Sequence, residues 1–214
     1  IGLKFGEGPG TLPEPPAFEW IKAVPSIVLV LLGFAVSLFL CRKVFGAESN
    51  GLKGLTQPQI DAVFARTQLT PGAEELIQVL QSLGYRIALI SGGFSCIADR
   101  LKARLGIHYA YANHLVFRDG ACTGEVKPPV VDALRKADLL ELIAQQESIE
   151  LDQVIAVGDG ANDIPMLEKA GLGIAFNAKP SVSERADLAL SQKNLKAILY
   201  LLGISGRDLP RVLA

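Results

Sequence analysis

The stretch Val157-Gly158-Asp159-Gly160-Ala161-Asn162-Asp163-Ile164-Pro165 places two carboxylates and an amide on a glycine-containing turn, directly after an apolar run. That run, Val154 to Val157, is typical of a strand buried on both faces of a parallel sheet. In open α/β sheets ligands bind beyond the carboxyl ends of such strands, so Asp159 is expected to face a site. Mg²⁺ takes oxygen ligands and shares them with phosphate, and the stretch therefore predicts a Mg²⁺ and phosphate site. A turn in which Asp159 only caps a helix is the alternative.

Strand and helix patterns alternate from Thr70 to the end of the chain, which predicts an α/β fold with a doubly wound parallel sheet of Rossmann type. Thr70 is expected to cap the first of these helices, with Pro71 at its first position. The expected strands are 85–90, 154–157, 172–176 and 188–190, with a hairpin over 112–126 and helices over 131–146 and 164–170.

A second polar turn follows the strand expected at 85–90. It reads Ser91-Gly92-Gly93, so a hydroxyl and two backbone amides stand together where a strand ends. Such groups can hold phosphate oxygens. Taken alone, a plain turn explains these residues equally well.

These stretches resemble motifs of the haloacid dehalogenase (HAD) superfamily of phosphotransferases, and most closely those of its phosphoserine phosphatases. The Gly-Asp-Gly turn resembles the fourth motif, Ser91-Gly92-Gly93-Phe94 the second, and Arg135-Lys136-Ala137-Asp138 the third, in the family's order. The resemblance covers roughly three quarters of the chain. It implies a HAD-like phosphatase core over residues 70–205 and a remnant of a helical cap domain over 52–69.

The resemblance also implies a chemistry, the Mg²⁺-dependent hydrolysis of O-phospho-L-serine to L-serine in serine biosynthesis, through an aspartyl-phosphate intermediate. For the phosphate it implies binding by Ser91, Gly92 and Gly93, charge neutralisation by Lys136, and a hydrogen bond to phosphate or substrate from Asn162. For the metal it implies direct Mg²⁺ binding by Asp159 and orientation of the site by Asp163.

One part of the family pattern is absent from this sequence. Phosphatases of the family begin with a strand that ends in Asp-x-Asp, whose first aspartate attacks phosphorus. This sequence has no aspartate before Asp61 and no Asp-x-Asp anywhere. We therefore expect activity to be impaired or lost, because phosphate monoesters are among the slowest biological substrates to hydrolyse unaided.

The N-terminal residues do not resemble the family. Residues 1–22 are rich in Gly and Pro and predict an irregular lead-in, whereas residues 23–41 carry no charge over 19 positions, long enough for a membrane helix. That interpretation is favoured and predicts a cytoplasmic domain anchored to the inner membrane. The alternative is a substitute first strand over Ser26 to Leu32, which periodicity cannot distinguish from a membrane helix. A third interpretation is foreign sequence joined to a truncated gene.

Two functions follow from these patterns. The first is a phosphoserine phosphatase-like domain whose hydrolysis is impaired, and the second is a membrane-tethered inactive module that still binds phosphate or a partner. Nucleic acid is set aside as a partner, because the net charge is −1 and no basic patch is interleaved with aromatic residues.

Overall fold

The computed structural model describes residues 28–32, 49–64 and 69–204. Seven strands form one sheet in the order β4-β3-β2-β1-β5-β6-β7, and every neighbouring pair is parallel except β3 and β4. The strands are β1 Val28–Leu32, β2 Arg86–Phe94, β3 Tyr109–Arg118, β4 Ala121–Lys127, β5 Val154–Gly158, β6 Leu172–Phe176 and β7 Leu188–Leu190. The α-helices are α3 Gln57–Phe64, α4 Ala73–Ser82, α5 Ser95–Leu105, α6 Ala133–Glu147, α7 Ile164–Lys169, α8 Pro180–Ser183 and α9 Ala197–Leu201. The predicted α/β class with a doubly wound parallel sheet is confirmed.

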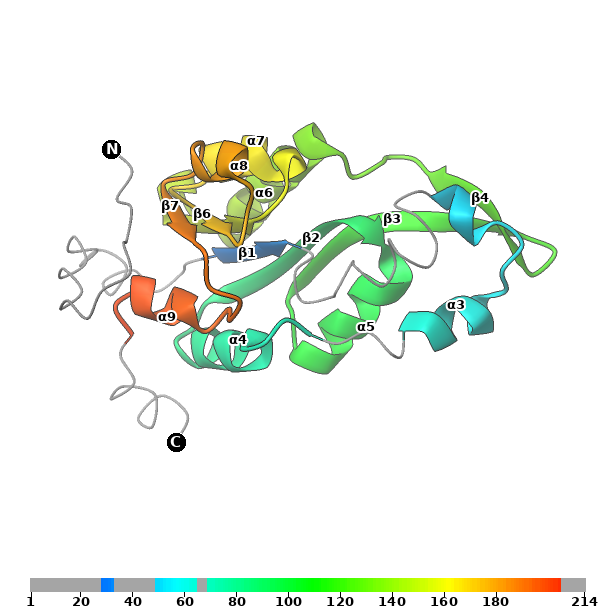
Figure 1. Ribbon diagram of the computed structural model, residues 1–214, viewed down its shortest axis with the longest axis horizontal. Coiled ribbons are helices and arrows are strands. Elements are labelled where there is room, and N and C mark those ends of the chain that lie inside the picture. The colour runs from blue at the N-terminus through cyan, green and yellow to red at the C-terminus, as the bar shows by residue number, and fades with distance from the viewer. Residues whose placement is uncertain (1–27, 33–48, 65–68, 205–214) are drawn as a thin grey trace.

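Helices cover both faces of the sheet (Figure 1). On one face α4, α5 and α9 pack on the odd-numbered residues of β2 and β5, such as Ile87 and Ile155. On the other face α6, α7 and α8 pack on the even-numbered residues, such as Ala88 and Ala156. Successive side chains of a strand point to opposite faces, so each strand must be apolar at every position to fill both cores. This explains the unbroken apolar runs in the sequence.

Strand β1 corrects the interpretation favoured for residues 23–41. Val28–Leu32 form a strand, not part of a membrane helix, and this strand lies between β2 and β5 with parallel pairing to both. The alternative of a substitute first strand is confirmed for these five residues, and the rest of the apolar segment, like residues 1–22, lies outside the described residues. A helix long and apolar enough to span a bilayer is not found in the described parts of the chain. A membrane helix and a strand covered on both faces both consist of an unbroken run of apolar residues, so the sequence alone does not distinguish them.

The hairpin of β3 and β4 extends beyond the ends of the other strands, and residues 52–64, the described part of the segment assigned to the cap remnant, lie against it (Figure 1). The backbone N–H of Gly54 donates to the carbonyl of Cys122, and the N–H of Cys122 donates to the carbonyl of Leu55, each over 2.8 Å. Leu52, Ile60 and Cys122 form a small apolar cluster of their own. Leu52, Ile60 and the hairpin thus share a small core of their own, which Ile97 of α5 connects to one of the two sheet cores.

Stability should depend on the pairing of β1. Val30 is opposite Ala88 on one side and Ala156 on the other. Val30→Pro removes a backbone N–H from a central strand and leaves a carbonyl without its partner, which costs at least about 2 kcal/mol. We expect a matching fall in the free energy of unfolding by urea, or aggregation. Val30→Ala keeps the N–H and serves as the control, and equal stability of the two variants would contradict the central position of β1.

Candidate active site

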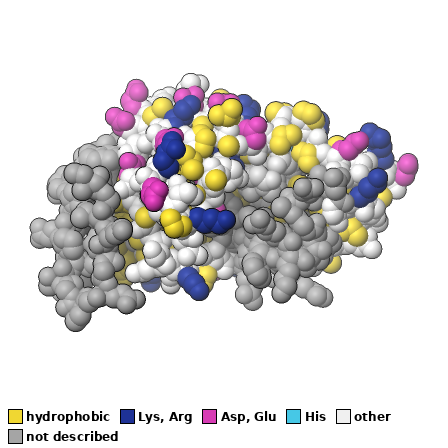
Figure 2. Space-filling model, turned by 45° about the horizontal axis from the view of Figure 1, so that its top comes forward, with side chains coloured by type: hydrophobic (Ala, Val, Ile, Leu, Met, Phe, Trp, Pro, Cys, Tyr) yellow, Lys and Arg dark blue, Asp and Glu magenta, His cyan; other side chains and the backbone are white. Residues whose placement is uncertain are grey.

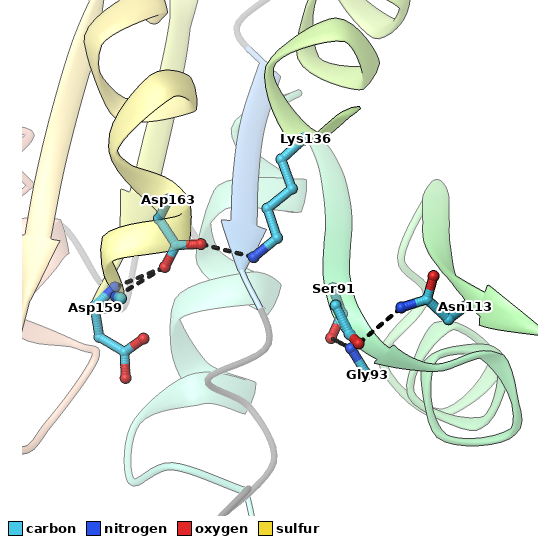
Figure 3. Close-up of polar contacts among 8 residues, drawn as sticks. Ser91, Gly93, Asn113, Lys136, Asp159 and Asp163 are labelled. Atoms are coloured by element: carbon cyan, nitrogen blue, oxygen red, sulfur yellow. Dashed lines mark hydrogen bonds and ion pairs between the residues drawn. The ribbon is translucent and has the colours of Figure 1, made fainter. Parts of the chain in front are cut away.

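Strands β1 and β5 end beside β2 at the edge of the sheet where the predicted site residues lie. Leu32, the last residue of β1, is in register with Ile90 of β2, and Leu31 is in register with Val157 of β5. Ser91 directly follows Ile90, and Asp159 directly follows the end of β5. Two motifs that are far apart in the sequence therefore flank the carboxyl end of β1, as Figure 3 shows.

Asp163 and Lys136 form a buried ion pair at this edge. The Nζ of Lys136 lies 2.7 Å from Oδ1 of Asp163, and the two side chains are only 4% and 3% exposed. The other oxygen of Asp163, Oδ2, accepts hydrogen bonds from the backbone N–H groups of Asp159 and Gly160, over 3.1 and 2.9 Å. Both carboxylate oxygens are therefore engaged, which fits a residue that shapes the turn and orients the lysine.

Asp159 presents the carboxylate of this turn that is open to a ligand. The residue is exposed at the surface, yet neighbouring atoms partly desolvate its carboxyl group. That desolvation and the negative charge of Asp163 raise the pKa of Asp159 to about 6, against the opposing effect of Lys136. The ionised carboxylate thus lacks full compensation from the protein, and a bound cation would supply it.

Residues 91–94, the Ser91 loop, are the irregular end of β2 beyond its pairing with β1, and hydrogen bonds within the protein hold them in place. Ser91 Oγ accepts a hydrogen bond from the backbone N–H of Gly93 over 3.0 Å, and the carbonyl of Gly92 accepts one from Nδ2 of Asn113 over 2.8 Å. Oδ1 of Asn113 in turn accepts from the backbone N–H of Val131 over 2.8 Å. Asn113 is 6% exposed and links the loop to the segment that leads into α6, the helix of Lys136.

The sequence patterns did not identify Asn113. An asparagine inside an expected strand is a signal of a special position, because that residue type is depleted in strands. Its two partners are backbone groups of distant segments, however, and side-chain pattern does not reveal them.

Asn162 lies beside the glycines of both turns. A Cβ added to Gly160 would stand 2.4 Å from Oδ1 of Asn162, and one added to Gly92 would stand 3.9 Å from its Nδ2. The first distance means that a side chain at Gly160 would displace the amide of Asn162. The second shows that Asn162 reaches from the turn after β5 to the last residues of β2, across the end of β1.

The structure thus gathers every predicted site residue at one edge. Ser91, Gly92 and Gly93 come from the end of β2, Lys136 from the first turn of α6, and Asp159, Asn162 and Asp163 from the turn after β5. Among the described residues there is no group of three His, Cys, Asp or Glu side chains arranged to hold a metal. A cation here would depend on Asp159, on waters and on a bound phosphate, as is usual for Mg²⁺. The surface carries basic and acidic side chains interspersed, with no broad basic face in this view (Figure 2).

A carboxylate turn beside a buried lysine, at the carboxyl edge of a doubly wound sheet, lies where proteins of this architecture bind their ligands. The chain belongs to the haloacid dehalogenase-like hydrolase family, whose sequence pattern matches residues 29–168. The match begins inside β1 and ends inside α7, so it includes the three strands that meet at the site.

Within this family the chain is similar to phosphoserine phosphatases. It is 46% identical over 151 residues to the one of Archaeoglobus fulgidus, covering 71% of this chain and 44% of that protein. It is 45% identical over 148 residues to the one of Methanocaldococcus jannaschii, covering 69% of this chain and 70% of that protein. The chain thus spans less than half of the Archaeoglobus relative.

The solved structures agree. A substrate-bound phosphoserine phosphatase complex superposes with a TM-score of 0.75 at 34% identity, covering 82% of this chain and 97% of that one. A phospho-aspartyl intermediate analogue of phosphoserine phosphatase gives a TM-score of 0.74 at 33% identity, covering 82% of this chain and 98% of that one.

Proposed function

We propose that this phosphoserine phosphatase-like domain binds Mg²⁺ and the phosphate of O-phospho-L-serine but hydrolyses the ester slowly or not at all. The observation that carries the proposal is that no aspartate directly follows β1, the strand between β2 and β5. Leu32 ends β1 in register with Ile90, and the next residues of the sequence are Gly33-Phe34-Ala35. The resemblance to the family places the two aspartates of the Asp-x-Asp pattern at the end of this strand.

Phosphate binding is supported by the remaining groups of the site. The Ser91 hydroxyl and the backbone of Gly92 stand on one side of β1, and Asn162 reaches toward them from the other side. Lys136 supplies a fixed positive charge, held in place by Asp163. A dianionic phosphate would meet the cation of Lys136, the Ser91 hydroxyl and the Asn162 amide, which the fold already gathers in one place, and such preorganised groups favour electrostatic binding.

The carboxylate of Asp159, in the turn after β5, is a suitable ligand for Mg²⁺. Mg²⁺ prefers carboxylate oxygen and is commonly bound by one or two carboxylates together with substrate phosphate. Asp159 offers such an oxygen, and its raised pKa marks a carboxylate that a cation would stabilise. Asp163 would not touch the ion but would hold the backbone of Asp159 in place. When bound, Mg²⁺ would neutralise charge on the phosphoryl oxygens.

Slow hydrolysis follows from the missing nucleophile. Enzymes accelerate phosphate-monoester hydrolysis by up to about 10²¹-fold, and positioning and charge stabilisation provide only part of this. Gly33 and Ala35 carry no nucleophilic group. The names of the relatives support phosphoserine as the ligand, and the present chain would retain recognition of the phosphate without formation of a covalent intermediate. Neither β1 nor the helices of the described residues support a membrane tether.

The proposal predicts that Asp159→Ala removes binding of inorganic phosphate that depends on Mg²⁺, because the variant lacks the ligand of the cation. Titration calorimetry with phosphate at fixed Mg²⁺ should show heat for the unmodified chain and a Kd weakened by at least about 100-fold for the variant, because loss of an outer-shell partner alone can cost a metal site that much and Asp159 would bind the ion directly. Asp138→Ala, which removes an exposed aspartate of α6, is the matched control and should bind normally. An absence of binding by the unmodified chain would overturn the proposed function.

A further inference from the structure

A second set of contacts joins helix α3 to helix α5, outside the site described above. Nη2 of Arg100, on α5, lies 2.9 Å from Oδ2 of Asp61 on α3, and Nη1 of the same arginine donates to the backbone carbonyl of Asp61 over 3.2 Å. Oδ1 of Asp61 accepts a hydrogen bond from Nε2 of Gln57, one turn earlier on α3, over 2.8 Å. Arg100 therefore binds both the side chain and the backbone of Asp61, and Gln57 fixes the other carboxylate oxygen of Asp61.

The two helices also enclose a thiol. Cys96, in the first turn of α5, packs on the cluster of Leu52, Ile60 and Cys122, and its own side chain is only partly exposed. Burial and the nearby charge of Asp61 raise the pKa of Cys96 to about 11. An unreactive thiol at this place is therefore a measure of how closely α3 is docked.

Helix α5 begins where the Ser91 loop ends. Phe94 is the last residue of β2 and the N-cap of α5, so a shift in the first turn of α5 moves the loop of Ser91 to Phe94 with it. Phe94 itself packs on the same apolar cluster as Cys96. The docking of α3 and the shape of the Ser91 loop thus depend on a common set of contacts.

We infer that Arg100 is a positioning residue, which ties α3 to α5 through Asp61 and thereby fixes the loop of Ser91 to Phe94. Residues 49–64 are then an immobile brace of the phosphate site, fastened to the hairpin on one side and to α5 on the other. The effect on phosphate affinity rests on the function proposed above, whereas the docking of α3 does not.

The test uses the full chain and two readouts that need no ligand, the rate at which a thiol reagent modifies Cys96 and the rate of amide hydrogen exchange in residues 91–96. Arg100→Ala should raise both rates by about fivefold, the upper range for a single partly exposed ion pair. Cys122→Ser in every variant removes the other described thiol, and Cys41→Ser removes the third. The matched control is Arg104→Ala, because Arg104 is one turn further along α5 and makes an ion pair with Glu74 of α4.

Charge reversal separates the ion pair from a general loosening of the fold. Asp61→Arg and Arg100→Asp each place like charges together and should give the fastest labelling of Cys96. The double variant restores the side-chain attraction, although not the contact with the carbonyl, so its rate should fall at least halfway back toward that of the unmodified chain. The phosphate Kd should follow the same order among these variants.

The outcomes distinguish this inference from the proposed function. If Arg100→Ala matches Arg104→Ala in both rates, or if Cys96 labels faster while exchange in residues 91–96 stays the same, the inference is overturned. If the unmodified chain fails to bind phosphate, only the proposed function is lost, and the labelling and exchange rates still decide whether Arg100 braces the loop.

Discussion

Lys136→Met is expected to lower the free energy of unfolding by about 3–5 kcal/mol and to remove phosphate binding. The variant leaves the carboxylate of Asp163 buried at 3% exposure without its cation, and an uncompensated buried charge costs this much. It also takes away the fixed positive charge beside the Ser91 loop. Urea unfolding gives the first quantity, and calorimetry with phosphate and Mg²⁺ gives the second.

The double variant Lys136→Met with Asp163→Asn separates the two effects. It removes both charges, and the amide oxygen of the new side chain can still accept from the backbone of Asp159 and Gly160, so most of the lost stability should return. Phosphate binding should not return, because the lysine is still absent. If both variants bound phosphate normally, Lys136 would have only a structural role.

Gly33→Asp combined with Ala35→Asp is expected to create hydrolysis of O-phospho-L-serine. Gly33 directly follows β1, whose last residue pairs with Ile90, and Ser91 directly follows Ile90. The double variant therefore restores the Asp-x-Asp of the family after a strand that already has its place in the sheet. Loss of a nucleophile typically costs up to about 10⁶-fold in kcat, so a gain of at least about 10³-fold in phosphate release is expected.

Two matched controls accompany this variant. Gly33→Asn with Ala35→Asn has the same shape without the carboxylates and should remain inactive. Ala35→Asp alone supplies an acid without the nucleophile and should also stay close to the unmodified chain. A double aspartate variant that folds, binds phosphate and still releases none would show that the end of β1 is not the place of the missing chemistry.

The sheet was predictable because its strands are buried on both faces, and a run such as Val154 to Val157 is too short for a membrane helix and too apolar for the surface. The same property made β1 ambiguous. Five apolar residues within a longer uncharged segment suit a bilayer as well as a sheet, and only the pairing of Leu29 with both Ile87 and Ile155 decides between them. Pairing between residues so distant along the chain leaves no local trace in the sequence.

The site was predictable wherever its chemistry lies within one turn. Asp159, Asn162 and Asp163 stand within five positions of one another, and the resemblance supplied Lys136 and Ser91. The bracing residue Asn113 was not predictable, because its partners are backbone atoms of other segments.

The start of α4 was misplaced by the sequence patterns. The helix begins at Ala73 with Gly72 as its N-cap, not at Pro71 with Thr70 as its cap. Gly72 adopts a φ of 79°, and a Cβ there would stand 2.0 Å from Oδ1 of Asn194, so the position requires glycine. The contact with Asn194 is made across more than a hundred positions of sequence, and the capping preference of Thr70 could not reveal it.

A single experiment on the unmodified chain decides whether the site binds its ligand without hydrolysing it. O-phospho-L-serine and Mg²⁺ are mixed with the chain in a calorimeter cell, and phosphate release is measured on the same sample. We predict a saturable heat of binding and no release above that of the Asp159→Ala variant. Release at about 1 s⁻¹ or faster, the lower end of ordinary enzyme turnover, would contradict the proposed function, because some group of this chain would then be forming the bond to phosphorus.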